Sequence, residues 1–100
     1  MKRVTLLAGL AISLGLAAQA QASTLAKAQY LSATCANCHG TNGKSNGGLA
    51  SLAGYDKAKF LATMKDFQTD KRPATIMHQL SKGYTDAQLE VMATFFASQK

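Results

Sequence analysis

The chain carries apolar residues at helical spacing in three stretches. The first stretch, residues 23–34, leads to a cysteine, and its apolar positions are Leu25, Ala28, Leu31 and Cys35. A recurrence every three or four residues is typical of a helix with one buried face. The hydroxyl group of Ser23 or Thr24 can cap its start by accepting a hydrogen bond from a free backbone N–H. We therefore expect a first helix over residues 23–34.

Two further helices are expected in the second half of the chain. Asp56 can cap a helix that runs to about Thr69, before Pro73, which cannot continue a helix. Its apolar stripe is Phe60, Leu61, Met64 and Phe67. Thr85 and Gln88 can form a capping box for a last helix that runs to about Ser98. Its apolar stripe is Leu89, Met92, Ala93 and Phe96, with Val91 and Phe95 beside it.

The segments between these helices are rich in turn residues. Residues 40–54 contain Thr-Asn-Gly and Ser-Asn-Gly-Gly, which favour turns with positive φ angles. A loop this long in a small domain needs a structural reason, and wrapping the edge of a cofactor is one. Residues 74–84 form a short connector that holds Met77 and His78. No strand pattern or internal repeat is visible, so we predict an all-α fold with three main helices.

The first 22 residues have the composition of a secretory signal peptide. A basic start precedes an uncharged apolar run over residues 4–18, and small residues follow in an A-x-A arrangement. We expect removal of residues 1–22 by cleavage after Ala22, with Ala20 as the alternative site. The apolar run is shorter than the roughly 20 residues of a membrane-spanning helix. The prediction is a periplasmic domain of residues 23–100, with no stable membrane insertion after cleavage.

The chain is basic, with a formal net charge of +6 at pH 7. We expect no nucleic-acid partner, because the protein is predicted to be exported. An acidic protein surface is the expected partner, since complementary charge raises the rate of encounter. An ordinary solvated surface would also explain most of the lysines. The candidate steering residues are Lys44, Lys57, Lys59, Lys71 and Lys82.

The chemistry of the chain is concentrated in Cys35-Ala36-Asn37-Cys38-His39. Two thiols separated by two residues can each add to a vinyl group at the edge of a haem, and the following histidine can bind the iron. This C-x-x-C-H pattern is typical of c-type haem attachment. A bound haem would also stabilise a domain too small to bury much surface. We therefore predict one covalent haem c on Cys35 and Cys38, with His39 as an axial ligand.

Three other roles exist for a C-x-x-C pair. A redox dithiol is expected beside a βαβ pattern, which the sequence lacks. A structural zinc site needs four ligands, and this chain has only Cys35, Cys38, His39 and His78 to supply them. A plain disulfide leaves His39 without a role. Haem attachment is the interpretation that uses all three residues of the motif.

The second axial position of the iron has four candidate ligands, Met64, Met77, Met92 and His78. Met64 and Met92 belong to helical apolar stripes, where a methionine is normally a core residue. Met77 lies in a connector, where the backbone can direct a side chain, and a thioether ligand raises the reduction potential. We expect Met77 as the ligand, with His78 as the alternative and an open sixth position as the third.

These features resemble the class I cytochromes c. The shared pattern is a helix leading into C-x-x-C-H-G, a glycine-rich loop, a middle helix, a ligating methionine and a last helix with paired aromatic residues, here Phe95 and Phe96. Within this class the chain is most similar to cytochrome c4-like domains and the cytochrome subunit of flavocytochrome c sulfide dehydrogenase. The similarity is carried by Cys-Ala-Asn-Cys-His-Gly-Thr-Asn-Gly, Ser-Leu-Ala-Gly, Lys-Arg-Pro-Ala-Thr-Ile-Met and Ser-Lys-Gly-Tyr-Thr-Asp.

The resemblance implies a small class I cytochrome c fold wrapped around one haem, with Met77 at the position of the methionine ligand. It implies a carrier of single electrons and not an enzyme, with redox proteins such as a terminal oxidase as partners. The alternative is the electron-accepting haem subunit of an enzyme whose flavoprotein subunit oxidises sulfide. A ligand sensor or peroxidase-like protein is a third hypothesis, which requires an open sixth position.

Two positions depart from the class I pattern. Ala50 takes the place of a proline whose neighbourhood usually supplies a carbonyl to the axial histidine, so the acceptor of the His39 proton is left open. Ala28 lies near the place of a glycine, and we expect it to be small enough for the last helix to cross closely.

Arg72 is a candidate partner for a haem propionate, since a guanidinium can bind a carboxylate through two hydrogen bonds. A surface residue at a helix end is the alternative for Arg72.

Overall fold

The computed structural model describes the backbone of residues 2–100 and the side chains from residue 15 onward. Its long helices are α1 (Lys2–Ser32), α3 (Lys57–Gln68) and α5 (Asp86–Ser98). The short helical turns are η1 (Ala33–Cys35), α2 (Ala36–His39), η2 (Thr41–Gly43), α4 (Met77–Leu80) and η3 (Ser81–Gly83). Within residues 2–100 there is no strand, so the all-α prediction is confirmed.

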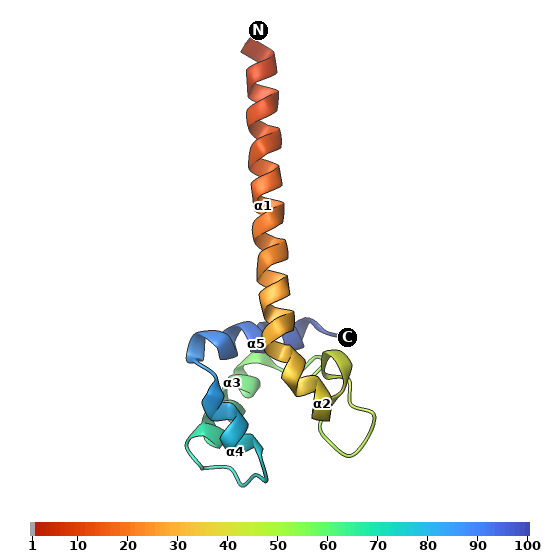
Figure 1. Cartoon of the computed structure of the whole chain (residues 1–100), viewed down its shortest axis with the longest axis vertical. Helices are drawn as coiled ribbons and strands as arrows, with labels where there is room; N and C mark the ends of the chain where they lie inside the picture. Colours follow the sequence, from red (N-terminus) through yellow and green to blue (C-terminus); the bar gives the residue numbers. More distant parts are fainter. Residues whose placement is uncertain (1) are drawn as a thin grey trace.

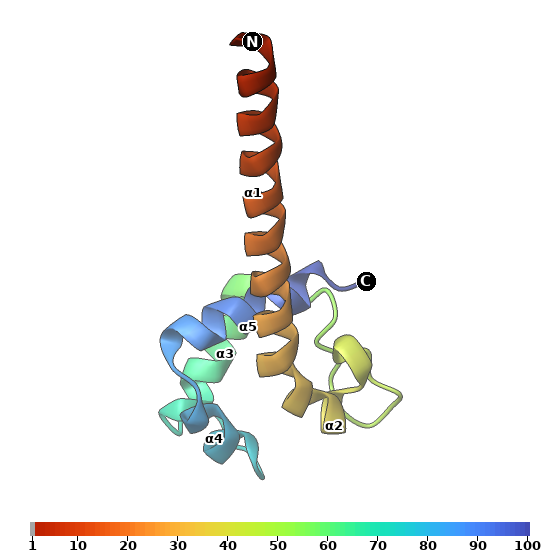
Figure 2. The ribbon, with the colours of Figure 1, turned by 45° about the horizontal axis from the view of Figure 1, so that its top comes forward.

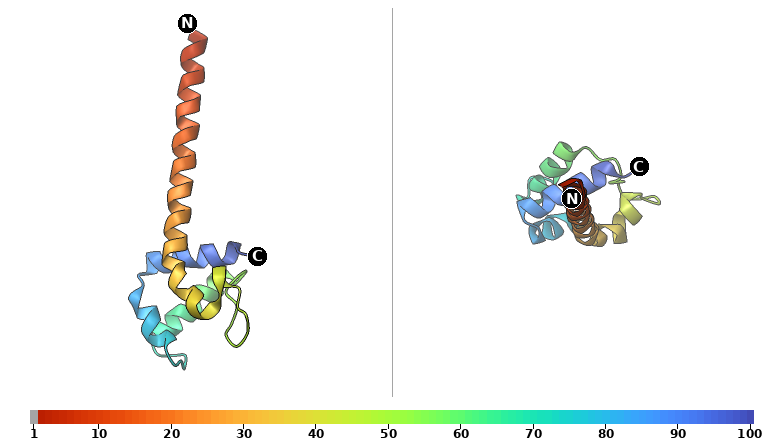
Figure 3. Two further views of the ribbon diagram at one scale, coloured as in Figure 1. Left: turned by 45° about the vertical axis from the view of Figure 1, so that its right-hand side comes forward. Right: turned by 90° about the horizontal axis from the view of Figure 1, so that it is seen from above.

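The long first helix stands apart from the other elements. In Figure 1, the N-terminal part of α1 projects away from the rest of the molecule, and the remaining helices lie around its C-terminal end. The right-hand view in Figure 3, which looks along α1, shows the other elements arranged around this end of the helix. The side chains of residues 15–27 are exposed, and Ala28 is the first described residue of α1 that belongs to the core.

The start of α1 differs from the expected first helix. The helix begins at Lys2 and continues without a break through both candidate cleavage sites. Ser23 and Thr24 therefore do not cap a helix in this chain, and the Thr24 hydroxyl donates to the Ala20 carbonyl within the helix at 3.0 Å. The physical reason is that this alanine- and leucine-rich segment favours helix and contains no proline.

The signal-peptide prediction for residues 1–22 stays a prediction. Much of its apolar run, up to residue 14, has side chains outside the described residues. None of the helices in the described part of the chain combines the length and hydropathy of a membrane-spanning segment.

The other two long helices begin where the sequence predicts. The Asp56 carboxylate accepts a hydrogen bond from the Lys59 backbone N–H at 2.9 Å. The capping box of α5 is complete, because the Gln88 N–H donates to the Thr85 hydroxyl at 3.2 Å and the Thr85 N–H donates to the Gln88 side chain at 2.9 Å. These bonds satisfy backbone donors that a helix start leaves free. Local chemistry therefore places both helices.

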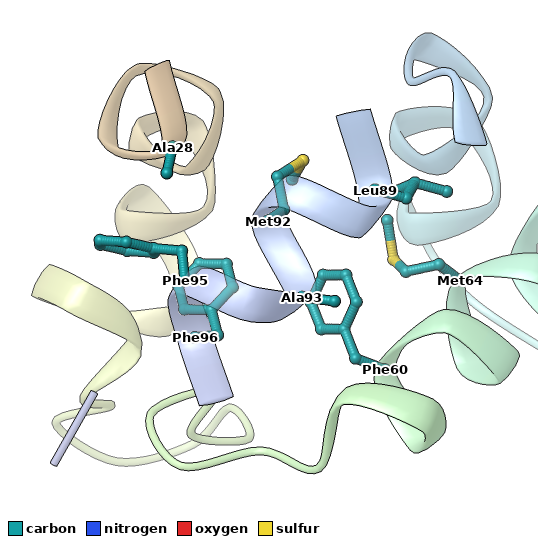
Figure 4. Close-up of a cluster of buried hydrophobic side chains, with 8 residues drawn as sticks. All are labelled: Ala28, Phe60, Met64, Leu89, Met92, Ala93, Phe95 and Phe96. Atoms are coloured by element: carbon teal, nitrogen blue, oxygen red, sulfur yellow. The ribbon is translucent and has the colours of Figure 1, made fainter. Parts of the chain in front are cut away.

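The core is centred on α5, which crosses the lower part of α1 and packs on α3 (Figure 2). The side chains of Met92 and Ala93 have 0% exposure, and the ring of Phe96 lies 5.9 Å from that of Phe60 between centroids. Figure 4 shows the buried cluster, which consists of Ala28, Phe60, Met64, Leu89, Met92, Ala93, Phe95 and Phe96. The expected core positions of Ala28, Met64 and Met92 are confirmed.

The predicted connector over residues 74–84 is wrong in part, because it contains α4 and η3. The backbone N–H groups of Gln79 and Leu80 donate to the Ile76 carbonyl and close the turn of α4. A helix this short is not stable on its own. It is supported by α3, with which it packs, and this tertiary support is absent from the local sequence pattern.

Candidate functional site

The two cysteines lie in the Cys–His segment, which we define as residues 33–53. Cys35 ends η1 and Cys38 lies in α2, three residues further on, so the two side chains leave the same side of the helical turn. Both thiols are free, Cys35 half-buried and Cys38 exposed. Burial raises the pKa of the Cys35 thiol, an effect larger than the lowering caused by its hydrogen bond with Thr34.

The ring of His39 is oriented by a backbone carbonyl. Its Nδ1 atom lies 2.6 Å from the carbonyl oxygen of Ala50. Because a carbonyl oxygen only accepts hydrogen bonds, Nδ1 carries a proton, and in the neutral ring Nε2 keeps a free lone pair. This is the arrangement that orients metal-binding histidines. The acceptor that the sequence leaves open is thus the carbonyl of Ala50.

Two glycines let the chain turn back so that Ala50 reaches His39. Gly40 has a φ of +86°, and a Cβ atom there would overlap the Lys44 carbonyl. Gly43 has a φ of +79°, and its carbonyl accepts hydrogen bonds from the N–H groups of Leu52 at 2.7 Å and Ala53 at 3.1 Å. The loop predicted to wrap a cofactor edge is therefore held by its own backbone.

The remaining predicted ligand lies in the Met77 segment, which we define as residues 69–84. The Met77 side chain is half-buried and packs against the core cluster. The next residue, His78, points in a different direction, because consecutive helical residues are about 100° apart. The Nδ1 atom of His78 is buried and has no hydrogen-bond partner among the described residues.

In Figures 1 and 2 the Cys–His segment, with α2, lies to the right below α5, and the Met77 segment, with α4, lies to the left below it. Both segments carry large apolar side chains that are exposed, namely Leu49, Ile76 and Leu80. A haem fits this donor set, since it offers two vinyl groups to the thiols, an iron to His39 and an apolar ring to cover these side chains. Three or more Cys, His, Asp or Glu side chains do not gather anywhere in the described part of the chain.

The candidate steering lysines fall into two groups. Lys57 pairs with Glu90 at 2.8 Å and Lys82 with Asp70 at 3.4 Å, while the Lys59 ammonium lies 5.5 Å from the centroid of the Tyr55 ring. No ion pair with a described residue is formed by Lys44 or Lys71. Of these two lysines, Lys44 lies in the Cys–His segment and Lys71 lies in the Met77 segment.

The position of Arg72 is set by an aromatic ring of α3. Its guanidinium carbon lies 5.5 Å from the centroid of the Phe67 ring, a cation–π geometry. The predicted contact of Arg72 with a haem propionate stays a prediction.

Two polar contacts near the site are absent from the sequence predictions. The side-chain amide of Gln68 donates to the carbonyls of Ser81 at 2.8 Å and Tyr84 at 3.3 Å. The hydroxyl groups of Tyr84 and Thr34 share a hydrogen bond of 2.7 Å. These partners are 13 to 50 positions apart in the chain, so no periodicity or motif could have revealed them.

Comparison with known proteins agrees with this donor set. No protein-family model matches the chain. The cytochrome subunit of sulfide dehydrogenase from Chlorobaculum tepidum is 32% identical over 75 residues, which are 75% of this chain and 68% of that protein. Cytochrome c4 from Pseudomonas aeruginosa is 37% identical over 97 residues, 95% of this chain and 48% of that protein. Cytochrome c-552 from Acidithiobacillus ferridurans is 31% identical over 64 residues, 64% of this chain and 28% of that protein.

The chain thus spans most of the first relative but only about half of the cytochrome c4. All three relatives are cytochromes, in agreement with the helical fold and the C-x-x-C-H motif. This chain belongs to the class I cytochrome c family and carries a covalently attached haem c.

Proposed function

We propose that this electron carrier is a periplasmic monohaem cytochrome that transfers single electrons between redox proteins. Cys35 and Cys38 hold the haem, and His39 and Met77 occupy the two axial positions of the iron. The observation that carries the proposal is the hydrogen bond from His39 Nδ1 to the Ala50 carbonyl, directly after the cysteine pair. It leaves Nε2 unprotonated on an oriented ring, as an iron ligand requires.

Each residue of the site has a distinct role in this chemistry. The S–H group of each cysteine adds across a vinyl C=C bond, with sulfur going to one carbon and hydrogen to the other, so no oxidant is consumed. When bound, the haem supplies an iron that changes its charge by one electron. The Ala50 carbonyl keeps His39 in the ligating tautomer. The thioether of Met77 raises the reduction potential relative to harder ligands and denies substrates access to the iron.

The ligand assignment is tested by two matched substitutions, Met77→Leu and Met64→Leu. Both replace a methionine by a residue of similar volume, which cores tolerate well. Met77→Leu should abolish the weak far-red absorption band of methionine-bound ferric haem, and the reduced protein should then bind carbon monoxide readily. Met64→Leu should change neither property, because Met64 is a buried core residue.

Two outcomes would contradict His39 and Met77 as the axial pair. Rapid carbon monoxide binding by the unaltered reduced protein would mean an open sixth position. An unchanged spectrum in Met77→Leu, together with carbon monoxide binding in a His78→Gln variant, would assign the ligand to His78 instead.

Export is part of the proposal and rests on the first 22 residues. Since the side chains of residues 15–27 are exposed, loss of residues 1–22 would remove no described core contact. Mass analysis of the protein purified from the periplasm should give a chain that begins at Ser23. A haem-bearing chain that retains residues 1–22 would contradict removal of the leader.

A second candidate function is favoured by the relative from Chlorobaculum tepidum, which is named as a subunit of sulfide dehydrogenase. In this alternative the chain accepts electrons from a flavoprotein subunit that oxidises sulfide. Purification of the tagged protein from its native cells distinguishes the two functions. A stoichiometric flavoprotein partner with sulfide-dependent haem reduction would favour the subunit, whereas a monomer that exchanges electrons with an oxidase would favour the free carrier.

A further inference from the structure

A hydrogen bond between two side chains joins the Cys–His segment to the Met77 segment. The hydroxyl groups of Thr34 and Tyr84 lie 2.7 Å apart, and the two residues are 50 positions apart in the chain. Thr34 directly precedes Cys35, and Tyr84 directly follows η3, the turn that continues from α4. Among the residues whose side chains the structure describes, this is the one hydrogen bond between residues 33–53 and residues 69–84.

The Tyr84 end of this hydrogen bond is anchored in α3. The Gln68 amide donates to the Ser81 and Tyr84 carbonyls, which places both ends of η3 against α3. The Tyr84 side chain is half-buried and packs against the core cluster, so its ring has a defined direction. The hydroxyl at the tip of this ring reaches the residue that precedes the first cysteine.

The Met77 segment is held mainly by its contacts with α3. It contains no buried apolar side chain, and Ile76 and Leu80 on either side of Met77 are exposed. Its helix α4 has four residues, too few to be stable without tertiary support. Segments with few buried apolar contacts open locally at lower free energy than the core. The Thr34–Tyr84 hydrogen bond therefore adds a tie to the cysteine side that the contacts with α3 do not supply.

We infer that Thr34 and Tyr84 form a clasp that positions Met77 and sets how often its sulfur leaves the iron. This inference rests on Met77 being the axial ligand, as proposed above. Tyr84 and Thr34 are positioning residues, because neither hydroxyl is assigned to the iron. When the hydrogen bond opens, the Met77 segment loses its tie to the cysteine side, and an external ligand can take the sixth position.

The test measures carbon monoxide binding to the reduced holoprotein in Tyr84→Phe, Thr34→Val and the double variant. For a closed site, the binding rate follows the fraction of molecules in which the methionine is displaced. Each single variant should bind carbon monoxide about two- to twelvefold faster than the unaltered protein, the factor that corresponds to the net contribution of one neutral hydrogen bond. The double variant should match the single ones, since the same bond is lost in all three.

Two controls separate a clasp from general destabilisation. Tyr30→Phe removes the hydroxyl of a tyrosine on α1 that is 81% exposed, and it should leave the binding rate unchanged. Thr85→Ala removes the N-cap of α5, so it should lower the melting temperature without raising the rate of carbon monoxide binding. The far-red band should persist in Tyr84→Phe, because Met77 is still bound in most molecules.

The outcomes distinguish the clasp from the ligand assignment. If the unaltered protein has the far-red band but Tyr84→Phe binds carbon monoxide at the unaltered rate, the clasp is wrong and Met77 ligation stands. Rate increases that multiply in the double variant would also overturn the clasp, because the two hydroxyls would then act independently. If the unaltered protein lacks the band and binds carbon monoxide at once, Met77 ligation fails, and the clasp fails with it.

Discussion

The α5 core and the two segments that carry the proposed ligands are held by different forces. In the core, side chains of α1, α3 and α5 interlock, and Met92 and Ala93 are inaccessible to solvent. In the Cys–His and Met77 segments, the positions of the ligands depend on backbone turns and single hydrogen bonds, such as those of Ala50 and Tyr84. The core is held by contacts between polypeptide side chains, whereas Leu49, Ile76 and Leu80 of the segments are exposed.

This difference indicates how folding and function are divided in the chain. The helices around α5 form a platform whose packing follows from apolar side chains. The two segments extend from this platform and carry the residues that are proposed to hold the haem. Substitutions in the core should therefore change stability. Substitutions in the segments should change haem binding and ligand exchange, and they should change stability where they remove the haem or touch the core.

The largest effect is expected from Cys35→Ser/Cys38→Ser, which removes both attachment points. A domain of this size buries too little apolar surface to be stable without a staple. The variant should lose its covalent haem and most of its helical signal in circular dichroism. A variant that keeps the full helical content and melting temperature would contradict a stabilising role of the attached haem.

Phe96→Ala should lower the stability of the α5 core. Its ring contacts Phe60 and Phe95, and its loss leaves a cavity that costs about 3–5 kcal/mol of unfolding free energy. Denaturant unfolding of the holoprotein measures this change, while the far-red band should be retained in the folded fraction. Leu25→Ala on the exposed face of α1 is the control and should change stability by about 0.5 kcal/mol or less.

A smaller effect is expected at Gly43, where the Cys–His segment touches the core. A Cβ atom there would lie 2.8 Å from the Ala53 backbone nitrogen and 2.9 Å from the Phe96 ring, at a φ of +79°. Gly43→Ala should therefore cost about 1–3 kcal/mol in thermal or denaturant unfolding. Gly83→Ala is the matched control, because its Cβ would meet no atom within 4 Å. Equal stability of the two variants would contradict a tight contact at Gly43.

The parts of this fold that could be predicted from sequence are those with local causes. The caps at Asp56 and Thr85 and the apolar stripes of α3 and α5 depend on residues a few positions apart. The C-x-x-C-H motif likewise holds its chemistry within five residues. Locally encoded features of this kind predicted the long helices of the core and the attachment site.

The remaining features depend on contacts between distant residues. The Ala50 carbonyl is chosen by the path of the whole loop, α4 forms because α3 supports it, and the partner of Thr34 lies 50 positions away. The start of α1 was predicted wrongly because a cap at Ser23 or Thr24 presupposes a chain that begins there. Such features depend on contacts between residues that are distant in the chain, and these contacts cannot be predicted from the local pattern of a single sequence.

Covalent attachment of haem to the cysteine pair is tested most directly by mass analysis of a proteolytic digest. Trypsin should release residues 28–44, which contain both cysteines, by cleavage after Lys27 and Lys44. After extraction of the holoprotein with acid and acetone, this peptide should still carry the mass of one haem. An unmodified peptide, with all of the pigment in the organic phase, would contradict the account.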